Sequence, residues 1–220
     1  MLNFEEKSDV NMKVGVMVAM ESERNALRDA GVDNVILTGI GKVNAAMTAT
    51  EFILGQKPDC IVSSGVAGGI DSSLRPGDFV LGRECAYYDV WCGEGNLRGQ
   101  VQGLPQRFSS GESLLSVARR LAVPGVNVHE GLICTGDRFL ETVNEAEEVK
   151  SIYPDALACD MESAAVAQVC GRFGVPFVSF RAISDVLAVD SAEHWQSYEG
   201  FWDNLKAGSF AILKAFLENL

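Results

Sequence analysis

Short apolar runs alternate along this chain with longer segments of helical periodicity, and this alternation constrains the fold more than any other feature. The apolar runs have the length of strands and are bounded by glycine or polar residues. They cover Lys13–Met20, Asn34–Thr38, Cys60–Ser64, Asp78–Leu81 with an extension to Tyr88, Val128–Cys134 and Pro176–Ile183. The pattern predicts an α/β protein in which buried strands form a sheet covered by helices.

The segments between the predicted strands carry helical periodicity, with one exception. Predicted helices cover Glu21–Ala30, Val43–Leu54, Glu112–Leu121, Asn144–Ile152, Met161–Phe173 and Trp202–Leu217. Residues Asp89–Phe108 contain Gly, Pro and mixed polarity without a period, which predicts a long loop. Since no linker, repeat or low-complexity segment interrupts the pattern, we expect one domain over residues 12–220, preceded by an N-terminal extension over residues 1–11.

The charge balance disfavours several classes of partner. The chain has 220 residues, with 18 basic and 30 acidic side chains and a net charge of −12. Such a chain repels phosphate backbones and anionic head groups, so neither nucleic acid nor a membrane surface is expected as a partner. No apolar run approaches the ~18 residues of a membrane span, and the charged N-terminus does not resemble a signal peptide. We therefore expect a cytoplasmic protein.

The six cysteines do not form a metal-binding pattern. They include no C-x-x-C pair, and the chain has only two histidines. A zinc site is therefore not expected. Most of the cysteines lie inside apolar runs, and we predict buried free thiols for the set Cys60, Cys85, Cys92, Cys134, Cys159 and Cys170.

Glycine, small hydroxyl or acidic residues follow five of the predicted strands. The segments are Met20–Glu23, Gly39–Lys42, Gly65–Gly69, Thr135–Phe139 and Ser184–Asp185. Glycines that only turn the chain account for one or two such clusters, but not for the carboxylates among them. Since ligands of open α/β sheets bind at the carboxyl ends of the strands, a wide binding edge is expected there.

Three carboxylates at these positions are candidates for chemistry. Glu23 lies in the first turn of a helix, where it would also stabilise the helix dipole by about 0.3–1 kcal/mol. Glu162 lies among small apolar residues, where a carboxylate is costly to bury unless it is hydrogen-bonded, so we expect it to face a cleft. Asp185 ends a strand, so capping the next turn and binding a ligand are equally good interpretations.

Other motifs are weaker. The glycine clusters fit neither the Walker pattern nor a dinucleotide fingerprint, and no G-x-S-x-G elbow is present. Phe139 is either a core aromatic or an aromatic that stacks on a base. Tyr198 and Phe201 lie in an acidic, irregular stretch that either packs or closes over a site.

The order of the motifs is the most specific signal in the sequence. Along the chain come V-A-M-E-S-E (Val18–Glu23), G-I-G-K-V (Gly39–Val43), S-G-V-A-G-G (Ser64–Gly69), G-D-R-F (Gly136–Phe139), D-M-E (Asp160–Glu162) and R-A-I-S-D-V (Arg181–Val186). In this order and spacing they resemble the 5′-methylthioadenosine/S-adenosylhomocysteine nucleosidases, a family of the purine nucleoside phosphorylase and uridine phosphorylase superfamily. The resemblance runs from Met12 to the C-terminal helix.

This resemblance implies a three-layer α/β sandwich with a mixed central sheet, the nucleoside phosphorylase-like fold. It also implies a homodimer, a small purine nucleoside as substrate, no metal and no organic cofactor. The implied reaction is hydrolysis of the N-ribosidic bond of 5′-methylthioadenosine and S-adenosylhomocysteine, with release of adenine. In the matching positions, Glu23 activates the attacking water, and Asp185 protonates purine N7 with help from Ser184.

The same resemblance implies the contacts to base and sugar. Phe139 matches the aromatic that stacks on the base, and the backbone of Leu140 matches the group that contacts the purine edge. Met161 and Glu162 match the ribose contacts, with Glu162 holding the sugar hydroxyls. Arg181 matches a residue near the water or anion site.

The remaining implied contacts lie around the pocket, where the chain also departs from the family. Gly68, Ile40 and Tyr198 complete the expected substrate-binding set, with Tyr198 as an aromatic lid, and Gly103–Pro105 resembles a loop that the partner subunit contributes to the 5′ pocket. The region before the second predicted helix is short where the family usually has extra strands. Val66 stands where the family commonly has a small hydroxyl, and because valine cannot hydrogen-bond phosphate, it argues against phosphorolysis.

Three alternative functions remain. A related nucleosidase for another 5′-modified purine nucleoside, such as futalosine or 5′-deoxyadenosine, fits the shortened region. A purine nucleoside phosphorylase would transfer the ribosyl group to phosphate. A nucleoside-binding protein would keep the pocket without turnover, but the presence of Glu23, Glu162 and Asp185 together argues against it.

Overall fold

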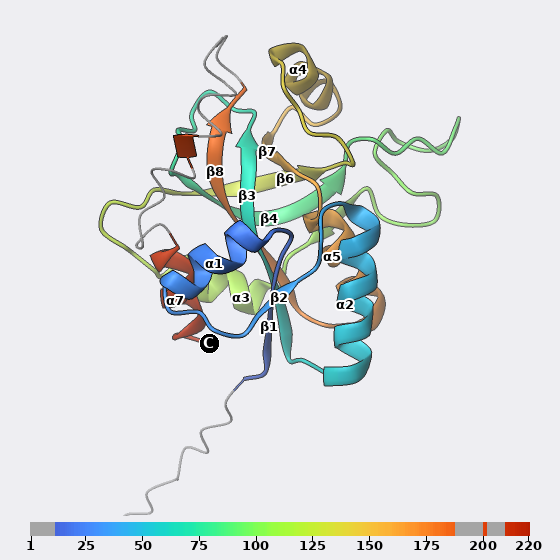
Figure 1. The fold of residues 1–220 in the computed structure, drawn as a ribbon. Coiled ribbons are helices and arrows are strands. Elements are labelled where there is room, and N and C mark those ends of the chain that lie inside the picture. The colour runs from blue at the N-terminus through green and yellow to red at the C-terminus, as the bar shows by residue number, and fades with distance from the viewer. Residues whose placement is uncertain (1–11, 188–199, 202–209) are drawn as a thin grey trace, which may run out of the picture.

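The computed structural model describes residues 12–187, 200–201 and 210–220. Three expectations lie outside the described residues: the N-terminal extension over residues 1–11, Tyr198, and residues 202–209 of the last predicted helix. The described residues form a mixed sheet with helices packed on both of its sides (Figure 1). This is the α/β sandwich with a mixed central sheet that the sequence predicts.

Eight strands form the sheet in the described part of the chain. They are β1 (Val14–Val18), β2 (Val35–Leu37), β3 (Cys60–Gly69), β4 (Phe79–Tyr87), β5 (Arg107–Ser109), β6 (Val128–Thr135), β7 (Ala156–Asp160) and β8 (Phe177–Val186). Their order is β2-β1-β3-β7-β6-β4-β5, and β8 pairs with both β3 and β4. β8 therefore closes a circuit with β3, β7, β6 and β4, in which β3–β7 and β4–β8 are antiparallel and the other pairs are parallel.

The closed circuit brings three strand ends to one place. Gly68, near the end of β3, lies opposite Cys159 of β7 on one side and opposite Asp185 of β8 on the other. The register between β3 and β8 shifts between Ala67 and Gly68, which is a local irregularity of the kind that re-aims side chains beside functional sites. The ends of β3, β7 and β8 thus form one edge, as expected for a ligand site.

Helices cover the sheet on two sides (Figure 1). They are α1 (Glu21–Asp29), α2 (Lys42–Gln56), α3 (Glu112–Ala118), α4 (Val143–Ile152), α5 (Ser163–Phe173) and α7 (Ala211–Leu217). Side chains of α1, α3 and α7 share one buried apolar cluster with the sheet, and those of α2 and α5 share another. A third, smaller cluster lies under α4.

Small side chains let α2 and α5 approach each other closely. The buried face of α2 carries Ala45 and Ala49, and α5 begins with a buried run from Ser163 to Ala167. This packing places the N-terminus of α2 beside the N-terminus of α5. As a result the backbone N–H of Gly41 donates a hydrogen bond to the carboxylate of Glu162, 121 residues further along the chain.

Most predicted elements are confirmed, but two strands were missed. The segment expected to be loop throughout, Asp89–Phe108, ends in the short strand β5, which is too brief to show a period. β7 lies directly before α5, and its small residues merge with the helical pattern, so the predicted helix Met161–Phe173 in fact begins at Ser163. β2 is the single strand between α1 and α2, in agreement with the predicted short region.

Five of the six cysteines lie in the predicted environment. All six cysteines are free thiols, and five are buried. Cys92 is exposed instead, because it lies in the connection between β4 and β5 rather than in an apolar core run. Within residues 12–187, 200–201 and 210–220, no helix has the length and apolar character needed to cross a bilayer.

Candidate functional site

A pocket opens where β3, β7 and β8 end and α1 begins. It contains nine of the residues that the sequence singled out, namely Glu23, Ile40, Gly68, Phe139, Leu140, Met161, Glu162, Ser184 and Asp185. Arg181 lies behind this pocket, where it lines a smaller cavity together with Glu162. Of the expected site residues, Tyr198 alone falls outside the described chain. Segments that are far apart in sequence therefore do converge on one site.

Glu23 is a buried carboxylate held by three backbone donors. Its Oε2 accepts the N–H groups of Ala19 and Met20 at 2.8 and 2.9 Å, and its Oε1 accepts the N–H of Val66 at 2.8 Å. Its side chain is 1% exposed, and burial raises its pKa, against the opposing influence of Arg181 and of the three N–H donors. The carboxylate therefore caps the start of α1 and also faces the pocket, so the helix-dipole interpretation is incomplete.

Glycine is required beside this carboxylate. Gly65 has a φ of +127°, a backbone conformation that residues other than glycine rarely adopt. A Cβ at this position would also overlap the Glu23 carboxylate. The same Cβ would come within 2.9 Å of Arg181 Nη1. Gly65 thus makes room for an acid and a cation at the same point of β3.

Glu162 lies at the N-terminus of α5, where its side chain turns toward the pocket. It is 6% exposed, and its Oε1 accepts the N–H of Gly41 at 2.9 Å. Burial raises the pKa of Glu162 to about 7; the Arg181 charge lowers it, and the Asp160 charge raises it further. A carboxyl group with such a pKa exchanges a proton near neutral pH.

Asp185 lies near the end of β8, next to a hydroxyl donor. Ser184 Oγ is 2.5 Å from Asp185 Oδ1 and 3.3 Å from the carbonyl oxygen of Ala67. The side chain of Asp185 is buried, and a Cβ at Gly68 would stand 3.3 Å from its Oδ2. The absence of a side chain at Gly68 therefore leaves space in front of the carboxyl group.

Large apolar side chains remain exposed at the mouth of the pocket. Phe139 is 43% exposed and Ile40 is 50% exposed. Phe139 is thus not a core aromatic, and it lines the wall of the pocket together with Leu140 and Met161. Exposed apolar groups at a concave site are typical of a surface that binds a flat apolar ligand face.

Asp160 at the wall of the pocket and Arg181 behind it form a buried ion pair. Arg181 Nε lies 2.9 Å from Asp160 Oδ2, and both side chains are 1% exposed. Thr135 Oγ1 donates to the other oxygen of Asp160 at 2.5 Å. The sequence pattern assigned no role to Asp160 or Thr135, although Asp160 begins the motif D-M-E and Thr135 begins the segment Thr135–Phe139.

A second feature that the sequence did not reveal is a cluster of polar contacts at the mouth of the pocket. Lys42 Nζ contacts both carboxylate oxygens of Asp89 at 2.6 and 2.7 Å, and the backbone N–H of Lys42 donates to Asp137 at 2.8 Å. The N–H of Asp137 in turn donates to Asp89. This cluster joins the start of α2, the end of β4 and the loop that carries Phe139.

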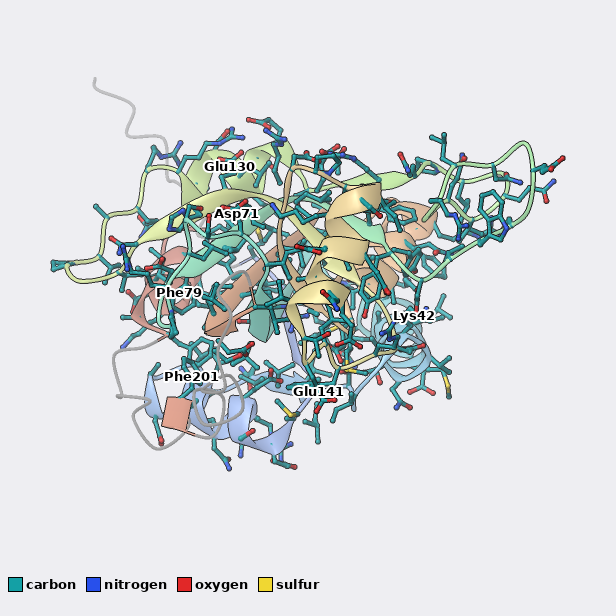
Figure 2. The ribbon with its side chains drawn as sticks, turned by 90° about the horizontal axis from the view of Figure 1, so that it is seen from above. Lys42, Asp71, Phe79, Glu130, Glu141 and Phe201 are labelled. Carbon is teal, nitrogen blue, oxygen red and sulfur yellow. The ribbon has the colours of Figure 1, made fainter. Side chains whose placement is uncertain are left out.

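The connection between β4 and β5 extends away from the body of the molecule on the side of α2 (Figures 1 and 2). Seen from above, Lys42 at the start of α2 and Phe201 beside α1 lie on opposite sides of the molecule (Figure 2).

In the described part of the chain, no group of three or more His, Cys, Asp or Glu side chains is arranged to hold a metal ion.

Comparison with known proteins places the chain in a family. The model of the Phosphorylase superfamily matches residues 29–218. A 5′-methylthioadenosine/S-adenosylhomocysteine nucleosidase of Geobacillus sp. (strain WCH70) is 36% identical over 233 aligned residues, which cover 95% of this chain and 99% of the relative.

Solved structures give the same result. The nucleosidase of that name from Neisseria meningitidis, in complex with methylthio-immucillin-A, has a TM-score of 0.84 at 34% identity and covers 94% of this chain and 98% of its own. The futalosine hydrolase of Helicobacter pylori has a TM-score of 0.85 at 27% identity, covering 97% and 100%. With a matching superfamily model, relatives above 30% identity and the same fold, this chain belongs to the phosphorylase superfamily and, within it, to the family of 5′-methylthioadenosine/S-adenosylhomocysteine nucleosidases.

Proposed function

We propose that this protein hydrolyses the N-ribosidic bond of 5′-methylthioadenosine and S-adenosylhomocysteine and releases adenine. The observation that carries the proposal is the convergence of Glu23, Glu162 and Asp185, three buried carboxyl groups from separate elements, on one pocket. The names of the similar proteins support the substrate class. Hydrolysis of such a bond needs an acid at the purine and a base at the sugar, and the pocket offers both.

Asp185 serves as the acid in this proposal. The C1′–N9 bond breaks readily only when the purine leaves as a neutral molecule, so N7 must gain a proton as the bonding electrons move to the base. Asp185 is buried and lies beside Ser184, whose hydroxyl contacts the carboxyl group and fixes its orientation. Phe139, exposed at the mouth, stacks on the purine ring and holds N7 against the acid.

Glu23 and Glu162 serve the sugar side of the reaction. As the bond breaks, the ribose gains positive charge, which nearby carboxylates stabilise. Glu23 takes one proton from water while the water oxygen bonds to C1′, and Glu162 accepts hydrogen bonds from the sugar hydroxyls. Asp185 ends the reaction ionised and Glu23 ends it protonated, so exchange of one proton through solvent restores the starting state.

The charges of the pocket favour water over phosphate as the nucleophile. Four acidic side chains line it: Glu23, Asp160, Glu162 and Asp185. The pocket arginine, Arg138, is paired with Glu145 at 2.5 Å, and Arg181 is paired with Asp160. Val66 adds an apolar side chain where an anion would need a donor. A phosphate dianion would meet the carboxyl groups of Glu23, Glu162 and Asp185 and no unpaired cation among the lining side chains of the described pocket.

A second substrate class is supported by one structural neighbour. The futalosine hydrolase of Helicobacter pylori is as similar in fold as the methylthioadenosine nucleosidases are. At this chain's pocket, Ile40 is half exposed at the mouth, which leaves room for a larger group on the ligand. Futalosine and 5′-deoxyadenosine are therefore the substrates to test beside the two thio-nucleosides.

A homodimer is part of the proposal, because α2 presents an exposed apolar face. Val43, Met47 and Leu54 on this helix are 68%, 57% and 62% exposed. The connection between β4 and β5, which includes Gly103–Pro105 and exposed Trp91, extends away from the body on the same side of the molecule (Figure 1). A second copy that covers this face of α2 would also bring its own β4–β5 connection toward the mouth of the pocket. Sedimentation velocity measures the mass of the protein in solution directly. A monomer at micromolar concentration would contradict the proposed homodimer.

Product analysis tests the proposed reaction. The protein is incubated with 5′-methylthioadenosine, S-adenosylhomocysteine, futalosine, 5′-deoxyadenosine or inosine, each with and without phosphate, and the products are separated by chromatography. We expect adenine and a free sugar from the two thio-nucleosides, at a rate that phosphate does not change. A ribose 1-phosphate product, or no release from either thio-nucleoside, would contradict the proposal.

A further inference from the structure

Buried charged groups gather on the sugar side of the pocket and directly behind it. Glu23, Asp160, Glu162 and Arg181 come from α1, β7, the start of α5 and β8, and all are buried. This cluster, called here the charge cluster, holds three carboxyl groups and one guanidinium. The guanidinium cannot pair closely with all three, so its position decides which carboxyl group is neutralised.

The guanidinium of Arg181 is fixed on two of its three nitrogens. Nε lies 2.9 Å from Asp160 Oδ2, and Nη2 donates to the hydroxyls of Ser63 and Ser163 at 2.9 and 3.1 Å. Among the described residues, Nη1 has no hydrogen-bond partner although it is buried. Nη1 is 3.6 Å from Glu162 Oε2 and lies beside Gly65, close to the Glu23 carboxylate. Nη1 is therefore directed between Glu162 and Glu23, the two carboxyl groups on the sugar side of the proposed reaction.

Asp160 is itself fixed independently of any ligand. Its carboxylate accepts the hydroxyl of Thr135 at 2.5 Å and the backbone N–H groups of Glu162 and Ser163 at 3.3 Å. Thr135 and Asp160 lie opposite each other in the parallel pair of β6 and β7, so the strand register sets this contact. A carboxylate so well supplied with donors keeps its place.

We propose that Asp160 is a positioning residue of the nucleosidase reaction, the counter-ion that holds Arg181 and thereby leaves Glu23 and Glu162 able to exchange protons. The proposal rests on the proposed function for its chemistry. With Asp160 ionised, the Arg181 charge is neutralised at Nε, and only Nη1 reaches the sugar side. Without that charge, the full guanidinium charge acts on Glu162 and Glu23 and favours their ionised forms.

Three buried thiols near the charge cluster do not titrate in the same range. Cys85 of β4, Cys134 of β6 and Cys159 of β7 lie within electrostatic range of Asp160, and Cys85 also lies within range of Arg181. Burial raises the pKa of each of these thiols well above its usual range, so they stay neutral. These thiols therefore contribute nothing to a pH response between about 4 and 9.

The decisive variant is Asp160→Asn, which keeps the shape and removes the charge. Its matched control is Asp155→Asn, which removes a carboxylate from the same strand region, where Asp155 pairs with Arg107 away from the pocket. The measurements are kcat and kcat/KM for adenine release against pH and the titration of 13C-labelled glutamate side chains by NMR. We expect Asp160→Asn to lower kcat by about tenfold or more and to move the Glu162 titration down by about one pH unit. Asp155→Asn should leave both unchanged.

The NMR titration separates the two proposals, because it needs no substrate. If the wild-type protein released no adenine, the proposed function would fail, and the titration would still test the role of Asp160. An unchanged Glu162 titration in Asp160→Asn would overturn the positioning role, whatever happened to the rate.

A second variant covers the case in which Asp160→Asn does not fold. Asp160→Glu keeps the charge and changes the reach by one methylene, so its Glu162 titration should stay at the wild-type midpoint while kcat falls. A displaced midpoint in Asp160→Glu, with the protein folded, would show that packing rather than charge sets the proton affinity of Glu162. That result would also overturn the proposal.

Discussion

Replacing Glu23 with glutamine separates the chemical role of the carboxylate from its role in the fold. The two side chains have the same shape, but glutamine offers one oxygen where the carboxylate offers two. Glu23 Oε2 accepts the N–H groups of Ala19 and Met20, and Oε1 accepts the N–H of Val66. The glutamine oxygen keeps the first pair of bonds, and its NH2 group then faces the N–H of Val66.

Two opposing contributions set the stability of this variant. A buried N–H without an acceptor costs about 1–3 kcal/mol. In the other direction, burial raises the pKa of Glu23, which means that its ionised form opposes folding at neutral pH, and the neutral amide removes that penalty. We therefore expect the free energy of unfolding to stay within about 2 kcal/mol of the wild-type value.

The activity of the same variant should fall far more than its stability. Loss of a general base lowers the rate by about 10²–10⁴. Glu21→Gln is the matched control, because Glu21 lies in the same helical turn but is exposed and pairs only with Arg24 among the described residues. Adenine release is measured by chromatography and stability by urea denaturation. A folded Glu23→Gln protein with activity within about threefold of Glu21→Gln would refute the base assignment.

Three further changes test neighbouring parts of the account. Asp185→Asn keeps the contact with Ser184 but has no proton to give, so kcat should fall by about 10²–10⁴ with little change in Tm; normal turnover would contradict the acid role. Gly65→Ala forces a Cβ against the Glu23 carboxylate at a φ of +127°, so urea denaturation should reveal a loss of about 1–3 kcal/mol, and an unchanged midpoint would contradict that reasoning. Burial raises the pKa of Glu162 from 4.5 to about 7. Between these two pH values the folded protein holds a proton that the unfolded chain has lost, so stability should fall as pH rises through this window. Glu162→Gln should flatten the fall in Tm, and an equally steep fall in this variant would contradict the reasoning.

The positions of the principal site residues were predictable because the fold rule and the residue types point the same way. Asp185 and Gly68 each follow or end a strong apolar run, and strand ends of an α/β sheet meet at one edge. The strand register then makes them direct neighbours. Residue type, position at a strand end and motif order were sufficient to place them.

The charge cluster was not predictable, because it depends on register between strands that the sequence does not pair. Thr135 and Asp160 meet only because β6 and β7 are parallel with those residues opposite each other, and β7 itself was missed. Arg181 reaches Asp160 from β8, whose neighbours in the sheet are β3 and β4. Long-range pairing of this kind leaves no periodic signal in a single sequence.

The polar contacts at the mouth of the pocket were not predictable either. Lys42 and Asp137 were both quoted in glycine-containing motifs, yet their shared contact with Asp89 joins three segments that are nearly 50 residues or more apart. Surface ion pairs have no characteristic spacing across loops. Only the assembled sheet brings them together.

Isotope incorporation from water tests the central claim most directly. The protein is incubated with 5′-methylthioadenosine in 18O-enriched, phosphate-free water, and the released sugar is reduced at once to block exchange at C1 before mass spectrometry. Hydrolysis predicts adenine without label and a sugar carrying one 18O atom. Adenine release with an unlabelled sugar, or with a sugar bonded to phosphate when phosphate is supplied, would contradict attack by water at C1′.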